Sequence, residues 1–185
     1  MLQITIPATS TEAWDEENEV FVTLEEKKAV TLQLEHSLVS LRKWESKWHK
    51  PFLTKSKKTD DETIDYIKCM TITQNVDPEV YSRVTDENID EIYRYINNPM
   101  TATTFAKDNS SKGNREVVTA ELIYYWMISL NIPFECQKWH LNSLLTLVRV
   151  CNVKNTPPKK RSKRDLISNY AAINAANKKR FNTRG

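Results

Sequence analysis

Glycine is almost absent from this chain of 185 residues, which contains only Gly113 and Gly185. An average protein of this length carries several times more, at about 7% of its residues. Two isolated glycines can build neither a dinucleotide-binding G-x-G-x-x-G turn nor a phosphate-binding GxxxxGK[ST] loop. They also exclude glycine-rich tight hairpins. The composition therefore predicts a helix-rich chain whose turns use proline, asparagine and aspartate.

Long apolar runs and paired cysteines are missing as well. The longest apolar stretch, residues 122–130, is interrupted by Ser129 and is far shorter than the about 20 residues that span a membrane, so we expect a core helix and no membrane association. Cys69, Cys136 and Cys151 are odd in number and form no C-x-x-C pair, which favours free thiols in a reducing cytoplasm. The N-terminus has no basic segment or cleavage site typical of secretion.

No set of residues has the spacing of a catalytic or metal site. None of His36, His49 and His140 has the spacing of a metal site, and we expect His140 to be a packed or rim histidine. The carboxylates of residues 60–62 fit the first turn of a helix, where the helix dipole favours negative charge. We therefore expect no catalytic residue, no metal and no cofactor, and we expect that the protein is not an enzyme.

Charge is distributed unevenly along the chain, whose net charge is +3. Residues 154–185 hold ten lysines or arginines and one acid, a net charge of +9, so residues 1–153 carry −6. Eight acids lie within residues 1–35, against Lys27 and Lys28. The basic tail can attract an acidic partner or the acidic front of another copy, which leaves a homo-oligomer open.

The N-terminal segment is expected to form a small antiparallel β-sheet. Residues 2–6 alternate apolar and polar side chains, the period of a half-buried strand. Residues 20–24 and 29–34 also have the pattern of strands and are rich in β-branched residues. Residues 25–28 are the expected connection between these two strands.

After this segment the apolar period becomes helical. Apolar side chains recur at steps of three and four over residues 38–48, which predicts a helix that ends before Pro51. Thr59 followed three residues later by Glu62 matches a capping box and predicts a second helix. Thr85 precedes a third helix, with acids in its first turn.

The most hydrophobic segment predicts a helix over residues 115–130 that is apolar on nearly every side. A short turn at Pro133 joins it to a helix over residues 134–153. Two helices joined so tightly are expected to pack antiparallel, at the centre of the core, with Leu145 buried between them. Residues 162–180 are weakly amphipathic, which predicts a fraying terminal helix at best.

These patterns together predict an α+β fold that is predominantly α-helical. We expect a small N-terminal antiparallel β-sheet, then a multi-helix bundle, then a basic C-terminal arm. The expected divisions are residues 1–35, 36–156 and 157–185.

Tryptophans and the basic tail supply the candidate partner-binding residues. Most of the five tryptophans are expected in the core, but tryptophan is enriched at interaction hot spots, so Trp44, Trp48 and Trp139 are candidate anchors. The tail contains a dense cationic cluster formed by Lys159, Lys160, Arg161, Lys163 and Arg164. Such clusters bind nucleic acid in many proteins. No aromatic residue interleaves with this one to stack on bases, so nucleic acid is the less favoured partner.

Several segments resemble one family of tailed-bacteriophage proteins. They are residues 31–41, 43–48, 65–70, 99–105 and 119–127 and, most distinctively, the stretch N-I-P-F-E-C-Q-K-W-H-L-N at residues 131–142. The resemblance covers nearly the whole chain, except the segments near residues 16 and 110. Proteins of this kind are described as tail assembly chaperones of long-tailed phages. The resemblance implies a non-enzymatic protein in the cytoplasm of a bacterial host, which binds the tape measure protein, the helical rod that sets tail length, or other tail proteins.

Two further functions stay open. A structural component of the virion, at the tail or the head–tail junction, would be present in purified particles at a fixed copy number, whereas a chaperone would be missing from them. A nucleic-acid-binding protein acting through the basic arm would bind DNA with a strong dependence on salt.

Overall fold

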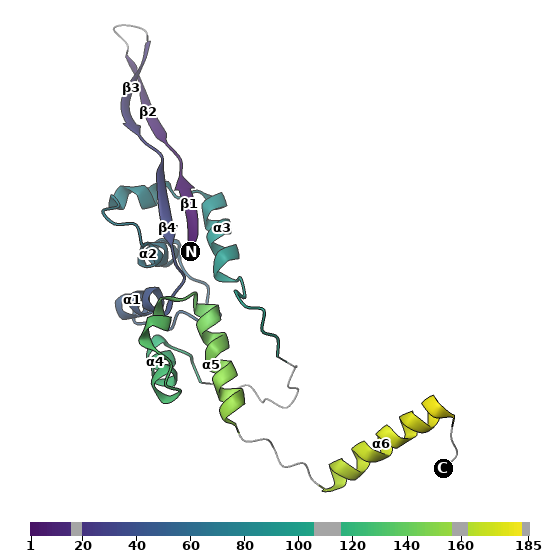
Figure 1. Ribbon diagram of the computed structural model, residues 1–185. Helices are drawn as coiled ribbons and strands as arrows, with labels where there is room; N and C mark the ends of the chain where they lie inside the picture. The colour runs from purple at the N-terminus through teal and green to yellow at the C-terminus, as the bar shows by residue number, and fades with distance from the viewer. Residues whose placement is uncertain (16–19, 106–115, 157–162, 183–185) are drawn as a thin grey trace. The chain divides into compact units, whose positions relative to one another are not determined.

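The computed structural model describes residues 1–15, 20–105, 116–156 and 163–182, and Figure 1 shows its strands and helices. The described residues form an α+β fold that is mostly helical, with antiparallel strands at the N-terminus, so the predicted fold class is confirmed. The chain separates into two compact units, residues 1–152 and 153–185, and the strands of the expected 1–35 segment belong to the first of them.

Four strands form two antiparallel pairs. Their bounds are β1 Leu2–Ile6, β2 Thr9–Asp15, β3 Val20–Lys27 and β4 Val30–Leu34. β1 pairs with β4, and β2 pairs with β3. The expected pairing of residues 20–24 with residues 29–34 is therefore wrong, because residues 25–27 continue β3 instead of forming a turn. The sequence did not predict β2, since residues 9–15 are largely polar and show no buried face.

The two pairs are halves of one interrupted hairpin. Ile6 lies opposite Val30 and Thr9 lies opposite Lys27, so the register runs unchanged across the break. Pro7 lies at the break and has no N–H to donate to the ladder, which explains why pairing stops there. Arg83 donates from Nη1 to the carbonyl oxygens of Pro7 at 3.1 Å and of Lys28 at 3.4 Å, and so joins the two strands where the ladder fails.

Six α-helices and two 3₁₀ helices, labelled η, follow among the described residues. Their bounds are α1 Leu38–Trp48, α2 Asp60–Met70, η1 Pro78–Arg83, α3 Asp86–Ile96, α4 Ala120–Ser129, η2 Phe134–Lys138, α5 Leu141–Asn155 and α6 Lys163–Phe181. The helix starts predicted at Thr59 and Thr85 are confirmed, because each threonine side chain accepts a hydrogen bond from the third residue of its helix.

Helix α1 is the centre of the core. It packs against α2, α4 and η2, and its residues Leu38, Leu41 and Trp44 are buried. The buried face of the β1–β4 pair, formed by Ile4, Ile6, Leu32 and Leu34, belongs to the same hydrophobic cluster. The β1–β4 pair and the helices of residues 1–152 therefore share one core.

The expected pair of central helices is wrong in two respects. The first helix begins at Ala120 rather than near residue 115, and the second is divided into η2 and α5 by Trp139 and His140. Helix α5 buries Leu141, Leu144 and Val148, while Leu145 is only half-buried. Leu145 is left half-buried because α1 occupies the central position, so that α4 and α5 each bury only one face.

The remaining predictions on this part of the chain concern thiols and membranes. Cys69, Cys136 and Cys151 are free, as predicted. Among the described residues, no helix is long and apolar enough to cross a bilayer. Helix α6, Lys163–Phe181, lies within one residue of the terminal helix predicted at residues 162–180.

Candidate partner-binding site

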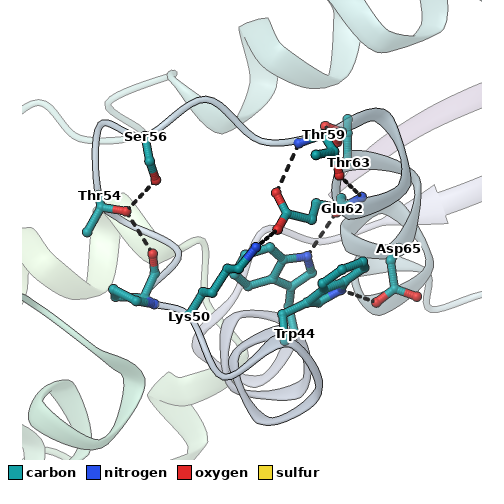
Figure 2. A network of polar contacts seen from close by, with 10 residues as sticks. Trp44, Lys50, Thr54, Ser56, Thr59, Glu62, Thr63 and Asp65 are labelled. Carbon is teal, nitrogen blue, oxygen red and sulfur yellow. Dashed lines mark hydrogen bonds and ion pairs between the residues drawn. The ribbon is translucent and has the colours of Figure 1, made fainter.

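The two tryptophans of α1 are held by the backbone and side chains of α2. Trp44 donates from Nε1 to the carbonyl oxygen of Glu62 at 2.8 Å (Figure 2). Trp48 donates from Nε1 to Oδ2 of Asp65 at 2.9 Å. The two indole rings stack with centroids 6.2 Å apart. Trp44 is only 1% exposed, so it is a core residue and is withdrawn as a partner-binding anchor. Trp48 is half-buried and keeps part of its surface accessible.

Lysines neutralise the carboxylates beside these rings. Lys50 donates to Glu62 Oε1 at 2.6 Å, and the backbone N–H of Thr59 donates to Oε2 at 2.9 Å, which together lower the pKa of the Glu62 carboxyl (Figure 2). Burial raises the pKa of Asp65, but hydrogen bonds from Lys47 and Trp48 outweigh it and leave the pKa below its ordinary value. Both carboxylates are therefore ionised and occupied by structural contacts.

An apolar slot opens beside this network, between α2 and α3. Its accessible volume is only about 30 Å³, and it is lined by Phe52, Lys58, Thr63, Tyr66, Ile67, Ile89, Ile92, Tyr93 and Ile96. Phe52 stacks on Tyr66 at a centroid distance of 3.9 Å. The ammonium group of Lys58 lies 4.3 Å above the centroid of Phe52. Burial lowers the pKa of Lys58, and the charge of Glu62 opposes this effect. The slot is thus apolar inside, with one cation at its edge.

A second exposed surface lies on α4 and η2. Tyr125 is 63% exposed, Ile128 61% and Phe134 52%, although the sequence predicted that α4 would be buried on nearly every side. Tyr124 contacts Phe134 with ring centroids 6.4 Å apart and lies one helical turn from Ile128, so these side chains adjoin. We call Tyr124, Tyr125, Ile128 and Phe134 the α4–η2 apolar patch.

Trp139 directly follows η2, and 49% of its side chain is exposed. Of the three tryptophans singled out from the sequence, it is the one with the accessibility that an anchor needs. The structure therefore retains Trp139 and, in part, Trp48 as candidate anchors.

The candidate basic residues are only partly described. Lys159, Lys160 and Arg161 lie outside the described residues. Lys163 is the first residue of α6, and the side chain of Arg164 is exposed. Helix α6 also exposes apolar side chains, among them Ile167, Tyr170, Ile173 and Phe181. The sequence pattern understated this apolar component, because alanines and asparagines between these residues weaken its periodicity.

Two histidines that are far apart in sequence meet in the interior. The rings of His36 and His140 lie 5.2 Å apart, and His36 Nδ1 is hydrogen-bonded to the Tyr66 hydroxyl at 2.6 Å. His140 donates from Nε2 to the carbonyl oxygen of Tyr95 at 3.1 Å and accepts from the backbone N–H of Asn142 at 3.3 Å. Both histidines are buried, which confirms the prediction made for His140. Because their polar atoms are occupied by the protein itself, we interpret the cluster as structural.

No metal centre accompanies these features in the part of the chain that the structure describes, where no group of three His, Cys, Asp or Glu residues could hold a metal ion. The slot and the α4–η2 apolar patch were both missed from the sequence. One signal in the sequence could have indicated the patch. Helix α4 is short and apolar on nearly every side, but the chain before it already supplies a central helix. One apolar side of α4 is therefore left without a place in the core.

No protein-family model matches the chain, and neither a curated protein nor a solved structure matches it. The function must therefore be argued from the exposed apolar surfaces and the charges around them.

Proposed function

We propose that this protein is a non-enzymatic tail assembly chaperone of a tailed bacteriophage, which binds helical segments of the tape measure protein in the cytoplasm of its bacterial host. The observation that carries the proposal is the α4–η2 apolar patch. Monomeric proteins rarely expose adjoining large apolar side chains, and such patches often mark interaction sites. The resemblance of the sequence to tail assembly chaperones supplies the partner.

An amphipathic helix is the chemistry that fits this surface. Tyr125 and Ile128 lie three residues apart on α4, and Phe134 extends the surface onto η2. A partner helix can lay an apolar stripe across such a ridge, with side chains at spacings of three and four residues. A tape measure protein is long and rich in such helices, and its apolar stripes need cover until the tail tube encloses them.

Replacing Tyr125 with serine and Ile128 with aspartate should reduce recovery of the co-expressed tape measure protein by about tenfold or more. Both side chains are more than half exposed, so the melting temperature should change little. The matched control is Ile72→Ser, which removes an exposed isoleucine that is not part of the patch. The measurement is co-purification on a tagged copy of this chain. Equal recovery with the double variant and the control would refute the proposal.

The alternative is a structural component of the virion, at the tail or the head–tail junction. A chaperone leaves before the particle is complete, so mass spectrometry of purified virions should find this chain only at trace level. A fixed number of copies per particle would favour the structural role.

A second candidate function, nucleic-acid binding, has one observation in its favour. Tyr170 and Phe181 are exposed on the same helix as Arg164 and the basic residues 178–180, and aromatic rings beside cations can stack on bases. This function predicts that fluorescence polarisation detects binding to single-stranded DNA. The affinity should fall by about tenfold or more between 50 and 200 mM salt, because phosphate contacts release counterions. Reversing the charges of residues 178–180 should abolish the binding. Affinity that is insensitive to both changes would exclude it.

A further inference from the structure

Helix α6 carries an apolar stripe that its own side chains leave uncovered. Every side chain of α6 that the structure describes is exposed. At about 100° per residue, Ile167, Tyr170, Ile173 and Phe181 fall within about 120° of the helix circumference, and we call these four residues the α6 stripe. Most of the stability of helices in proteins comes from packing of an apolar face, so a partner that covers the stripe would stabilise α6.

Two cations border the α6 stripe. Around the helix, Lys178 lies about 20° beyond Ile167 on one margin, and Arg180 lies about 20° beyond Ile173 on the other. Lys179 lies about 180° from the centre of the stripe, on the opposite side of the helix. A partner that covers the stripe therefore meets Lys178 and Arg180 but not Lys179.

The charge of these cations is not neutralised within their own segment. Residues 154–185 hold ten lysines or arginines and one acid, Asp165. Asp165 lies about 20 Å from Lys178 along the helix, which is about twice the screening length at 0.1 M salt. Among the described residues, neither Lys178 nor Arg180 forms an ion pair. The occupant that fits the α6 stripe is therefore acidic as well as apolar.

The chain itself contains an element of the opposite charge, the β2–β3 hairpin (Figure 1). Residues 9–28 hold seven acids against Lys27 and Lys28, a net charge of −5, and Lys27 is already paired with Glu79. Among the described elements, β2 and β3 pack mainly on each other. A two-stranded hairpin alone is marginally stable in water, so this hairpin also gains stability from a partner.

One face of the hairpin places carboxylates beside an apolar ring. Glu12 and Trp14 are two residues apart on β2 and therefore share a face. Ser10 belongs to the same face and lies opposite Glu26 on β3. Both glutamates are exposed, and 51% of Trp14 is exposed. Neither glutamate forms an ion pair with a described residue, so the charge of this face is available to a partner.

Apolar and charged groups have similar spacings on the hairpin and on α6. Along β2, the two glutamates of this face lie about 7–14 Å from Trp14. Along α6, Lys178 and Arg180 lie about 7–11 Å from Ile173. A contact that places the indole ring on the α6 stripe can therefore bring the carboxylates to the cations.

We propose that the α6 stripe binds the β2–β3 hairpin of a second copy of this chain, with Trp14 against the stripe. The two exposed glutamates of the hairpin then meet Lys178 and Arg180. Each copy has one stripe and one hairpin, so two copies can exchange them in a closed dimer with two equal contacts. Pairing of α6 with α6 is disfavoured, because it brings like charges together. This self-association does not depend on the proposed chaperone function.

Sedimentation velocity of the full-length protein, purified free of nucleic acid, tests the association. In 50 mM NaCl the protein should sediment with twice the mass of one chain at micromolar concentration. The dissociation constant should rise by about tenfold or more in 500 mM NaCl, because salt screens exposed charges. In 50 mM NaCl, Lys178→Glu combined with Arg180→Glu should raise it by about tenfold or more, because like charges then face each other.

An exchange of charges identifies the contact. Glu12→Lys combined with Glu26→Lys should weaken the dimer as the α6 variant does. The chain that carries all four changes should dimerise again, because the attracting charges are only exchanged. The matched control is Arg164→Glu combined with Lys179→Glu, which makes the same change of charge on α6 away from the stripe. This control should change the dissociation constant by less than about threefold.

Three results would overturn the inference. A monomer in 50 mM NaCl would leave the α6 stripe to an acidic partner other than this chain. Equal weakening by the α6 variant and its matched control would show an attraction that does not involve the stripe. A four-change chain that stays monomeric would separate the hairpin from the contact. All the changes are at exposed residues, so circular dichroism should find the helix content of each variant unchanged.

Discussion

Replacing Glu45 with alanine should lower the free energy of unfolding by about 2–5 kcal/mol, as expected when buried hydrogen-bond donors lose a charged acceptor. Glu45 lies on α1 and is 8% exposed. Its Oε1 accepts from the backbone N–H of Phe52 at 2.8 Å, and its Oε2 accepts from the backbone N–H of Ala120 at 2.8 Å. Both donors belong to buried residues, so neither can turn to water when the carboxylate is removed. One side chain thus holds the loop after α1 and the first turn of α4.

The position of Ala120 adds a helix-dipole contribution. It is the first residue of α4, where unpaired N–H groups concentrate positive charge that a carboxylate stabilises. Glu45→Gln should be intermediate, because an amide offers one acceptor oxygen for two donors. The control is Glu121→Ala, which removes an exposed acid from the same helix turn and should cost less than about 1 kcal/mol. Urea titration measures all three, and a loss below 1 kcal/mol for Glu45→Ala would contradict the assignment.

Acidification should destabilise the protein through the buried histidine pair. Burial, and then the neighbouring His140, hold the pKa of His36 at about 3, against an ordinary value of 6.5. Below pH 6.5 the unfolded chain therefore binds a proton that the folded protein excludes. Stability is unaffected by this group above pH 6.5, and it falls as the pH drops from 6.5 towards 3, by about 1.4 kcal/mol per pH unit.

The groups around His36 and His140 determine the pH interval in which their effect on stability is best measured. Burial also lowers the pKa of His140, whereas its hydrogen bond to Tyr95 and the charge of Glu35 oppose this, so His140 adds to the loss in the same direction. Glu35 accepts a hydrogen bond from the Tyr95 hydroxyl and pairs with the N-terminal amine of Met1. Ordinary carboxylates titrate mainly below pH 5, so the interval between pH 8 and pH 5 isolates the histidines.

Urea unfolding at pH 8 and pH 5 should differ by about 2 kcal/mol or more in the unmodified protein. In His36→Asn the difference should shrink by at least half, because asparagine places an uncharged amide near the position of Nδ1. The control is His49→Asn: His49 is exposed and has a positive φ of 52°, a conformation that asparagine tolerates, so the difference should persist. An equal pH dependence in His36→Asn and in the unmodified protein would refute the assignment.

Local signals in the sequence were sufficient for most helix boundaries. Thr59 and Thr85 each begin a helix because a side-chain oxygen satisfies a free amide within three residues. Pro7 interrupts the hairpin because it lacks an N–H, a property of one residue. Such effects involve neighbours along the chain, so the pattern of residue types is enough to predict them.

Strand pairing was less predictable, because it depends on partners that are distant in sequence. The patterns of residues 20–24 and 29–34 both predict strands, but neither segment indicates which strand it pairs with. The structure pairs β4 with β1, which buries Ile4 and Ile6 in the common core, and leaves β3 to pair with the polar β2. The correct register is the one that buries the apolar faces of β1 and β4 against the helices.

What the sequence by itself determined is therefore the α+β class and the starts of α2 and α3, since composition and neighbouring residues control each of these. Only the tertiary structure decided that Trp44 is buried while Tyr125 is exposed, that Glu45 reaches Ala120 across 75 residues, and that Lys58 closes an apolar slot. The physical reason is that α1 took the central position: a small core has room for one central helix, so α4 had to leave an apolar face outside.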